Sequence, residues 1–150
     1  MNTITIIGCG WFGFPLATQL VKQGFKVKAS KRDPDDLAQL QQAGIEAYQL
    51  DLAHIIADAK HSSLFDADAI VINIPPGLRR GDTDYLAYLT QLKNFIGERQ
   101  YQKVIFISTT GVYPSPNKMR RYLMIAVIFY YKQKRYFLQC KTAVLCDFQA

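Results

Sequence analysis

Short apolar runs alternate with stretches of helical spacing along residues 1–115. Apolar and β-branched runs predict strands at residues 4–7, 25–29, 45–50, 69–74 and 104–107. Apolar positions three and four apart predict helices at residues 15–23, 33–43 and 84–98. Residues 52–65 are ambiguous, with a short helix at residues 53–59 as one interpretation. Near-continuous apolar strands between amphipathic helices are typical of parallel sheets, so we predict an α/β fold with a doubly wound parallel sheet.

The pattern and the charge both change near residue 118. Residues 1–118 have 12 Lys/Arg and 11 Asp/Glu, whereas residues 119–150 have 6 and 1, so the net charge of +6 comes mostly from the second segment. A nucleic-acid-binding domain usually spreads its basic residues over a folded face, so we expect no nucleic-acid partner. We divide the chain into a first unit at residues 1–117 and an atypical basic and aromatic tail at residues 118–150.

Several other classes of protein are disfavoured by composition. The three cysteines have no metal-ligand spacing and form no even-numbered framework, so we expect no metal site and a reducing, cytoplasmic setting. The chain enters a strand pattern at once, without the basic and apolar segments of a signal peptide. The apolar run at residues 122–131 is short of the about 20 residues that span a bilayer, so we expect no membrane partner. That run could form a buried strand, a helix or a dimer contact, which leaves a homo-oligomer open. A basic helix at a membrane surface is the less favoured alternative, because the run lacks a clear polar face.

A glycine-rich turn follows the first predicted strand and opens the first predicted helix. Residues 8–13 read GCGWFG and match G-x-G-x-x-G in the strand–turn–helix context that makes this motif informative. In a Rossmann unit, Gly8 would permit the tight turn, Gly10 would let a pyrophosphate approach the backbone, and Gly13 would let helix and strand pack closely. The helix N-terminus would then face the phosphates. The alternative is a tight turn that binds nothing.

The other residues of the turn have two interpretations each. Trp11 and Phe12 could cover the cofactor, or they could pack under the sheet edge. Cys9 is interpreted as a small space-filling residue rather than a nucleophile, because no partner base is evident in the sequence.

The end of the second strand favours NADP over NAD. NAD-binding versions of this unit place a carboxylate there to accept from the ribose hydroxyls. That place falls at Ser30 or Lys31, and Arg32 follows, so two cations stand where a 2′-phosphate would lie. We therefore predict NADP as the cofactor, with NAD as the alternative. In the competing interpretation, both cations are solvated surface charges.

Two further strand ends supply candidate cofactor contacts. Asp51 follows the third strand, where its carboxylate would accept from the adenine amine, with Leu52 against the ring. A plain loop aspartate is the alternative. Pro75 follows the fourth strand, at the carboxyl edge of the sheet where ligands bind, and could border the adenosine or the ribose.

These features together resemble a known group. The glycine turn, Asp51 and residues 106–114, which read FISTTGVYP, are similar to extended or atypical short-chain dehydrogenase/reductases, often labelled NAD-dependent epimerase/dehydratases. The resemblance covers residues 1–117. It implies a Rossmann domain followed by a substrate lobe that this chain lacks. We therefore expect a truncated product, or a change of reading frame near residue 118.

The resemblance also implies catalytic residues. Thr109 matches the residue at the end of the fifth strand that hydrogen-bonds the substrate. Tyr130 and Lys134 match a Tyr-x-x-x-Lys pair, in which the ammonium lowers the pKa of the phenol so that it can act as a base. A chance match in an aromatic, basic stretch is the alternative.

The expected function follows from this likeness. It implies an NADP(H)-binding oxidoreductase or epimerase/dehydratase that acts on a small molecule at a carbon bearing oxygen. The alternatives are a non-catalytic NAD(P)-binding module and an inactive fragment that associates with itself through an exposed edge.

Overall fold

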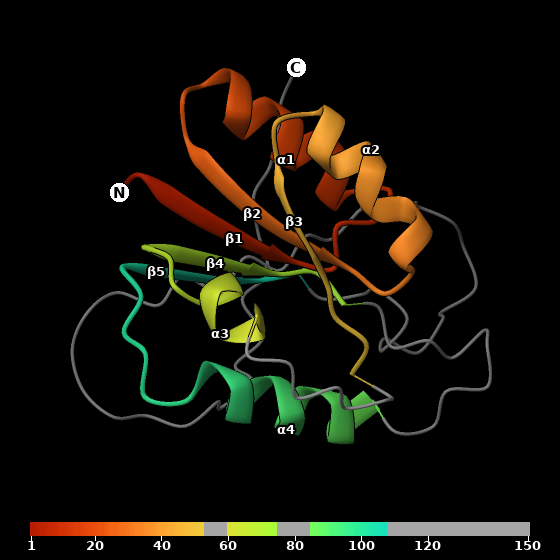
Figure 1. Ribbon diagram of the computed structural model, residues 1–150. Helices are drawn as coiled ribbons and strands as arrows, with labels where there is room; N and C mark the ends of the chain where they lie inside the picture. Colours follow the sequence, from red (N-terminus) through yellow and green to blue (C-terminus); the bar gives the residue numbers. More distant parts are fainter. Residues whose placement is uncertain (53–59, 75–84, 108–150) are drawn as a thin grey trace, which may run out of the picture.

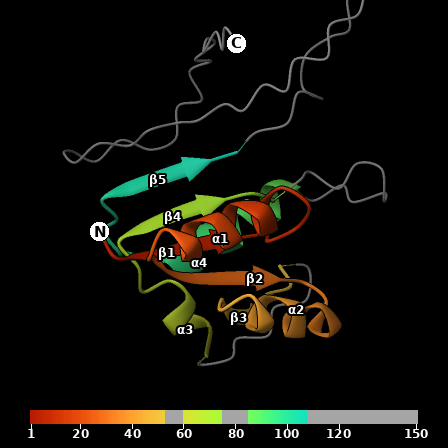
Figure 2. The same ribbon diagram turned by 90° about the horizontal axis from the view of Figure 1, so that it is seen from above.

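The fold is built around five parallel strands. The computed structural model describes residues 1–52, 60–74 and 85–107. The strands are β1 (Thr3–Ile7), β2 (Lys26–Lys31), β3 (Glu46–Gln49), β4 (Ala69–Ile72) and β5 (Lys103–Phe106). They pair in the order β3-β2-β1-β4-β5, as Figure 2 shows from above. This order confirms the predicted doubly wound parallel sheet and puts β1 at its centre.

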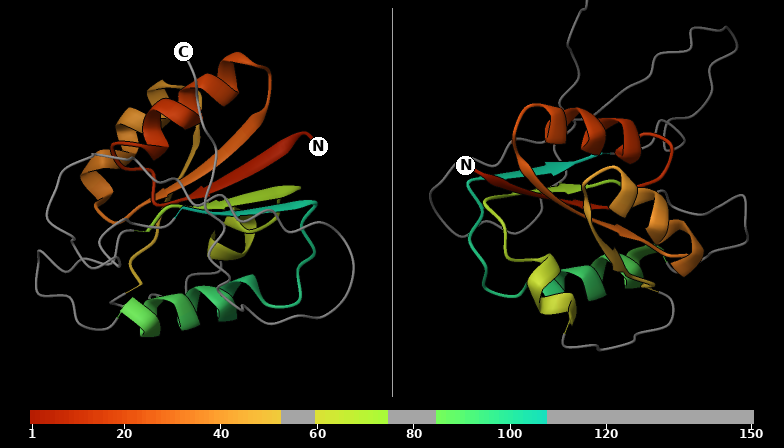
Figure 3. Two further views of the ribbon diagram at one scale, coloured as in Figure 1. Left: turned by 180° about the vertical axis from the view of Figure 1, so that it is seen from behind. Right: turned by 45° about the horizontal axis from the view of Figure 1, so that its top comes forward.

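Helices cover both faces of the sheet. They are α1 (Gly13–Lys22), the 3-10 turn η1 (Pro34–Asp36), α2 (Leu37–Gln42), α3 (Lys60–Leu64) and α4 (Tyr85–Ile96). Figure 1 shows α1 and α2 above the sheet and α3 and α4 below it, and the views in Figure 3 agree. The central strands β1 and β4 therefore have both faces buried, which explains why they read as almost uninterrupted apolar runs.

Strand alternation divides the core into two clusters. On the face of α1 and α2, Ile4, Ile6 and Val71 are buried in one cluster. On the face of α3 and α4, Ile7 and Ile70 belong to the other. Because successive strand residues point to opposite faces, one strand contributes to both clusters. The two clusters fix the strands, and through them the loops at their carboxyl ends.

Some predicted boundaries shift by a few residues. β2 continues to Lys31 rather than ending at residue 29, and α1 begins at Gly13 rather than residue 15. Asp33 caps the next turn as expected, because its Oδ1 accepts from the backbone N–H of Asp35 at 3.0 Å. The short helix expected at residues 53–59 lies outside the described residues, as does the tail at residues 118–150. A helix is present just beyond the first of these segments, as α3.

The carboxyl end of α3 is held by side chains from distant strands. Lys28 Nζ donates to the carbonyls of Ser63 at 2.5 Å and Asp66 at 3.0 Å. Thr5 Oγ1 donates to the Leu64 carbonyl at 2.6 Å. These bonds satisfy carbonyls that a helix end leaves without partners. They also explain how Lys28, only 6% exposed, is tolerated inside the fold.

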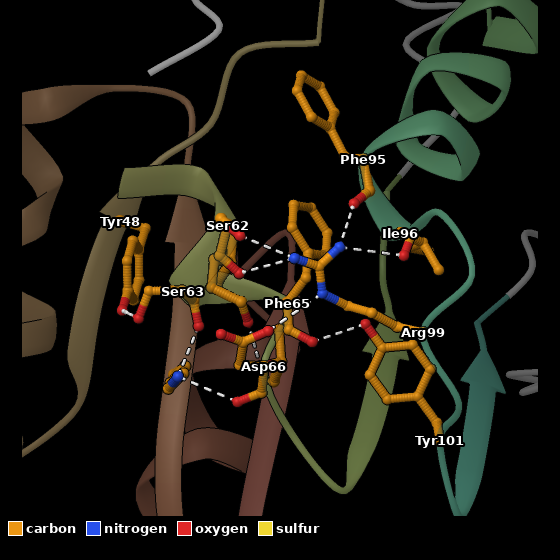
Figure 4. A network of polar contacts seen from close by, with 12 residues as sticks. Tyr48, Ser62, Ser63, Phe65, Asp66, Phe95, Ile96, Arg99 and Tyr101 are labelled. Atoms are coloured by element: carbon orange, nitrogen blue, oxygen red, sulfur yellow. Dashed lines mark hydrogen bonds and ion pairs between the residues drawn. The ribbon is translucent and has the colours of Figure 1, made fainter. Parts of the chain in front are cut away.

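The connection from α4 to β5 completes this arrangement. Arg99 donates from Nη2 to Ser62 Oγ at 2.8 Å and from Nη1 to the Phe95 carbonyl at 3.1 Å (Figure 4). Tyr101 OH donates to the Phe65 carbonyl at 2.8 Å. We call the carbonyls of residues 62–66 and the side chains that bind them the α3 cap. The α3 cap joins β1, β2 and the end of α4.

Candidate functional site

The glycine turn lies at the carboxyl end of the central strand. β1 pairs with β2 on one side and with β4 on the other, so the chain crosses over in opposite directions from this point. Ligands of open parallel sheets bind in the crevice at such a switch point. The turn runs directly from β1 into the N-terminus of α1.

The three glycines of the turn meet different surroundings. Gly8 has a φ of +87°, and a Cβ there would overlap the carbonyl oxygen of Asn73. A Cβ on Gly13 would lie 2.8 Å from the Gly8 carbonyl oxygen. A Cβ on Gly10 would have no heavy atom of the described residues within 4 Å. Gly8 and Gly13 are therefore required by the fold itself, whereas the space beside Gly10 is open.

Side chains from the two neighbouring strands hold Gly8. Ser30 Oγ on β2 accepts from the Gly8 N–H at 3.2 Å, and Asn73 Nδ2 after β4 donates to the Gly8 carbonyl at 3.0 Å. The backbone adds two more bonds, from Cys9 N–H to the Ser30 carbonyl and from Asn73 N–H to the Ile7 carbonyl, each 2.8 Å long. No sequence motif marked Asn73, because its role depends on a strand pairing across more than sixty residues. Ser30 is buried beneath the turn.

The first turn of α1 is open to an anion. The helix has no side-chain N-cap and no acidic residue in its first turn. Helix N-termini leave backbone N–H groups without partners and concentrate positive potential there. Together with the space beside Gly10, this makes a cradle that fits a pyrophosphate.

Trp11 and Phe12 differ in their exposure. Trp11 is 81% exposed, so the alternative that it packs under the sheet edge is wrong. Phe12 is half-buried and meets the Trp11 ring edge-on, with 6.2 Å between ring centroids. An exposed indole beside the cradle is available to a ligand.

Cys9 is inaccessible despite its place in the turn. Its side chain is fully buried, and burial raises the pKa of its thiol to about 11. A thiol in that state is a poor nucleophile at neutral pH. The structure supports the interpretation of Cys9 as a space-filling residue.

The two cations at the end of β2 are in different environments. Lys31 Nζ lies 3.1 Å from Asp36 Oδ2 and 3.3 Å from Gln39 Oε1, and its side chain is only 13% exposed. The interpretation of Lys31 as a solvated surface charge is therefore wrong. Arg32 is exposed, and its backbone carbonyl accepts from Gln49 Nε2 at 3.4 Å.

The remaining predicted contacts are placed in part. Asp51 is half-buried just beyond β3. Leu52 is 8% exposed and belongs to the core cluster on the face of α3 and α4, so little of it remains for an adenine ring. The four residues that lie outside the described part of the chain are Pro75, Thr109, Tyr130 and Lys134.

The described residues contain neither a metal centre nor a membrane span. Within residues 1–52, 60–74 and 85–107, no group of three or more His, Cys, Asp or Glu side chains could hold a metal ion. In the same ranges, no helix has the length and apolar character needed to cross a membrane.

Two curated proteins are similar to this chain over part of its length. Protein YeeZ from Escherichia coli (strain K12) is 35% identical over 118 residues, which cover 75% of this chain and 42% of that protein. Short-chain dehydrogenase/reductase GME11361 from Pestalotiopsis microspora is 37% identical over 74 residues, which cover 48% of this chain and 28% of that protein. The chain spans less than half the length of these curated relatives.

A solved structure and a family model complete the comparison. A functionally unknown conserved protein from Silicibacter pomeroyi DSS has the same fold, with a TM-score of 0.53 and 22% identity over 75% of this chain and 37% of that one. The model of the family described as NAD(P)H-binding matches residues 8–140, which include the whole glycine turn. The chain therefore belongs to the NAD(P)H-binding family, and its cofactor is a nicotinamide dinucleotide.

Proposed function

We propose that this protein is an NADP(H)-dependent oxidoreductase of the short-chain dehydrogenase/reductase type, acting at a carbon that bears oxygen. The observation that carries the proposal is the open space beside Gly10 at the uncapped N-terminus of α1. Gly10 has neither a positive φ nor a close neighbour among the described residues, so the fold alone does not require glycine at this position. The relative from Pestalotiopsis microspora, named a short-chain dehydrogenase/reductase, supports the reaction class.

The described residues divide the work of holding the cofactor. In this proposal Gly10 admits the pyrophosphate, while Gly8 and Gly13 shape the turn around it. Lys31 and Arg32 bind the 2′-phosphate of NADP, because guanidinium and ammonium groups suit phosphate oxygens. Asp51 accepts from the adenine amine, and Pro75 borders the adenosine, whereas Leu52 is taken up by the core. Ser30 acts through the turn, since its hydroxyl holds the Gly8 N–H.

The exposed ring of Trp11 completes the cofactor site. With Phe12 set edge-on against it, the indole would cover one side of the bound dinucleotide. An aromatic face at the mouth of the cradle would exclude water from the phosphates and strengthen the polar contacts beneath it. Trp11 is also the single tryptophan of the chain, so its fluorescence reports directly on this site.

The catalytic assignment rests on the resemblance. Thr109 would hydrogen-bond the substrate oxygen, and Tyr130 would donate a proton to it or accept one from it. The ammonium of Lys134 would lower the pKa of the Tyr130 phenol. When bound, the nicotinamide supplies or takes up the hydride. The chain's own residues orient the substrate and move the proton.

A titration with NADPH and NADH tests the proposal. We expect quenching of Trp11 fluorescence by both dinucleotides, with tighter binding of NADPH. Arg32→Ala should reduce this preference, because it removes a guanidinium that is proposed to bind the 2′-phosphate. Arg32 is exposed just beyond β2, so its loss disturbs no core contact. Failure to bind either dinucleotide would overturn the proposal.

Turnover is measured separately from binding. Consumption of NADPH over a panel of aldehydes, ketones and nucleotide sugars is the expected result for an oxidoreductase. Tyr130→Phe should lower the rate without changing the affinity for NADPH. Binding without consumption across the panel would favour a module that holds the dinucleotide without turnover.

A further inference from the structure

The ammonium of Lys31 is already bound by two side chains of the next helical segment. Its Nζ lies 3.1 Å from Asp36 Oδ2, at the end of η1, and 3.3 Å from Gln39 Oε1, on α2. The Lys31 side chain is 13% exposed, whereas that of Asp36 is 56% exposed. The cation is thus sheltered, and the carboxylate that holds it faces solvent.

Lys31 also lies beside the cofactor cradle. It follows Ser30, whose hydroxyl and carbonyl bind the backbone N–H groups of Gly8 and Cys9. Its positive charge reaches the buried thiol of Cys9, where it partly offsets the rise in pKa that burial causes. A group that binds Lys31 therefore acts at the mouth of the site.

The ion pair is expected to affect the two dinucleotides unequally. A 2′-phosphate has about two negative charges at neutral pH, and to reach Lys31 it would approach the Asp36 carboxylate. The phosphate and the Asp36 carboxylate would then repel each other, and both anions would share the one ammonium of Lys31. The 2′-hydroxyl of NAD is neutral and meets no such repulsion.

We propose that Asp36 is a specificity-determining residue, which weakens the preference of this site for NADPH by holding the Lys31 ammonium and repelling the 2′-phosphate. The inference rests on the proposed function, because it concerns the same site. Asp36 is a positioning residue here, since it acts through Lys31. Asp33, Asp35 and Asp36 lie in one short segment after Lys31 and Arg32, so carboxylates outnumber cations there.

The test compares Asp36→Asn with Asp35→Asn. Both variants remove one negative charge from exposed neighbouring positions, but Asp36 is the residue that pairs with Lys31. We expect Asp36→Asn to tighten NADPH binding about twofold to fivefold, the range set by partly exposed ion pairs. Its NADH affinity should stay near that of the wild type. Asp35→Asn should give less than half of that gain for NADPH.

The same comparison in the Lys31→Met variant tests whether Asp36 acts through Lys31. In Lys31→Met, adding Asp36→Asn should give a smaller gain for NADPH than it gives in the wild-type background, because the ammonium that the carboxylate holds is gone and only its repulsion of the phosphate remains. An equal gain in both backgrounds would contradict a role for Asp36 through Lys31. Thermal unfolding of each variant checks that the fold is intact.

The outcomes separate this inference from the proposed function. A wild-type protein that binds neither dinucleotide removes the proposed function. Binding of both, with equal gains in Asp36→Asn and Asp35→Asn, overturns the inference alone. Weaker NADPH binding in Asp36→Asn also overturns the inference, since Asp36 would then position Lys31 to bind the 2′-phosphate.

Discussion

Three glycines within six residues have separable roles in this molecule. Gly8 adopts a backbone conformation that side chains disfavour, and Gly13 lies against the Gly8 carbonyl. Gly10 has neither constraint. Glycines that the fold requires can therefore be distinguished from one that it does not require.

This separation predicts opposite results for two alanine variants. Gly10→Ala should change the free energy of unfolding by no more than about 1 kcal/mol, because the folded chain has room for the methyl group. It should weaken NADPH binding by about tenfold or more, since the methyl group would stand where the pyrophosphate approaches. Gly8→Ala should instead lose about 2 kcal/mol or more of stability through strain and overlap with Asn73.

Chemical denaturation and fluorescence titration of the same samples make this comparison. Gly24→Ala is the matched control, because Gly24 has a φ of +86° but open space around it. It lies just beyond the C-terminus of α1, whereas the cradle is at the N-terminus of that helix. It should lose some stability and keep the affinity of the wild type. Unchanged NADPH binding in Gly10→Ala would contradict the proposed position of the pyrophosphate.

At the scale of elements, α3 shows how a short polar helix can be held by its surroundings. The helix is five residues long, too short to be stable through its own hydrogen bonds. The α3 cap takes its donors from β1, β2 and the α4–β5 connection. Tertiary contacts, rather than local propensity, place this element.

Two lysines on β2 provide a matched test of the α3 cap. Lys28→Met should lower the free energy of unfolding by about 1–3 kcal/mol, because two carbonyls that Lys28 binds lose a charged donor. Lys26 is two residues away, and its 3.5 Å ion pair with Glu46 is exposed. Lys26→Met should change stability by less than about 1 kcal/mol. Equal losses in urea denaturation would show that Lys28 has no special role.

The sequence predicted the elements in which periodicity is strong. Strands such as residues 69–72 are apolar throughout, so their type follows from pattern alone, whereas their partners in the sheet do not. α3 was missed because its placement depends on side chains more than thirty residues away, among them Lys28, which composition marks as a surface residue. The cradle could be predicted from the spacing of the glycines. The hydrogen bond from Asn73 to the Gly8 carbonyl and the ion pair of Lys31 with Asp36 could not, because they depend on tertiary packing.

For the whole molecule, Tyr101 in the α3 cap makes one contribution to stability that depends on high pH. Burial raises the pKa of Tyr101 from its usual value near 10 to about 12. The folded state therefore retains this proton more tightly than the unfolded state does. The stabilisation that results is fully present below about pH 10 and is lost as the pH rises through about 12.

Tyr101→Phe should remove this contribution. Its free energy of unfolding should be lower than that of the wild type at pH 8, because the bond to the Phe65 carbonyl is absent. Between about pH 10 and 12 it should fall less steeply than the wild type. Urea denaturation over this range measures both slopes, and parallel curves would contradict the assignment.

The strand order also determines when the chain can assemble during synthesis. β1 emerges first, yet its edge opposite β2 is filled only when β4 arrives, with Ile4 beside Ala69. Parallel pairings between distant segments are slow to form, and an apolar strand waiting for its neighbour favours aggregation. The nascent chain therefore leaves the middle of its future sheet exposed until β4, which follows β1 by more than sixty residues, has been synthesised.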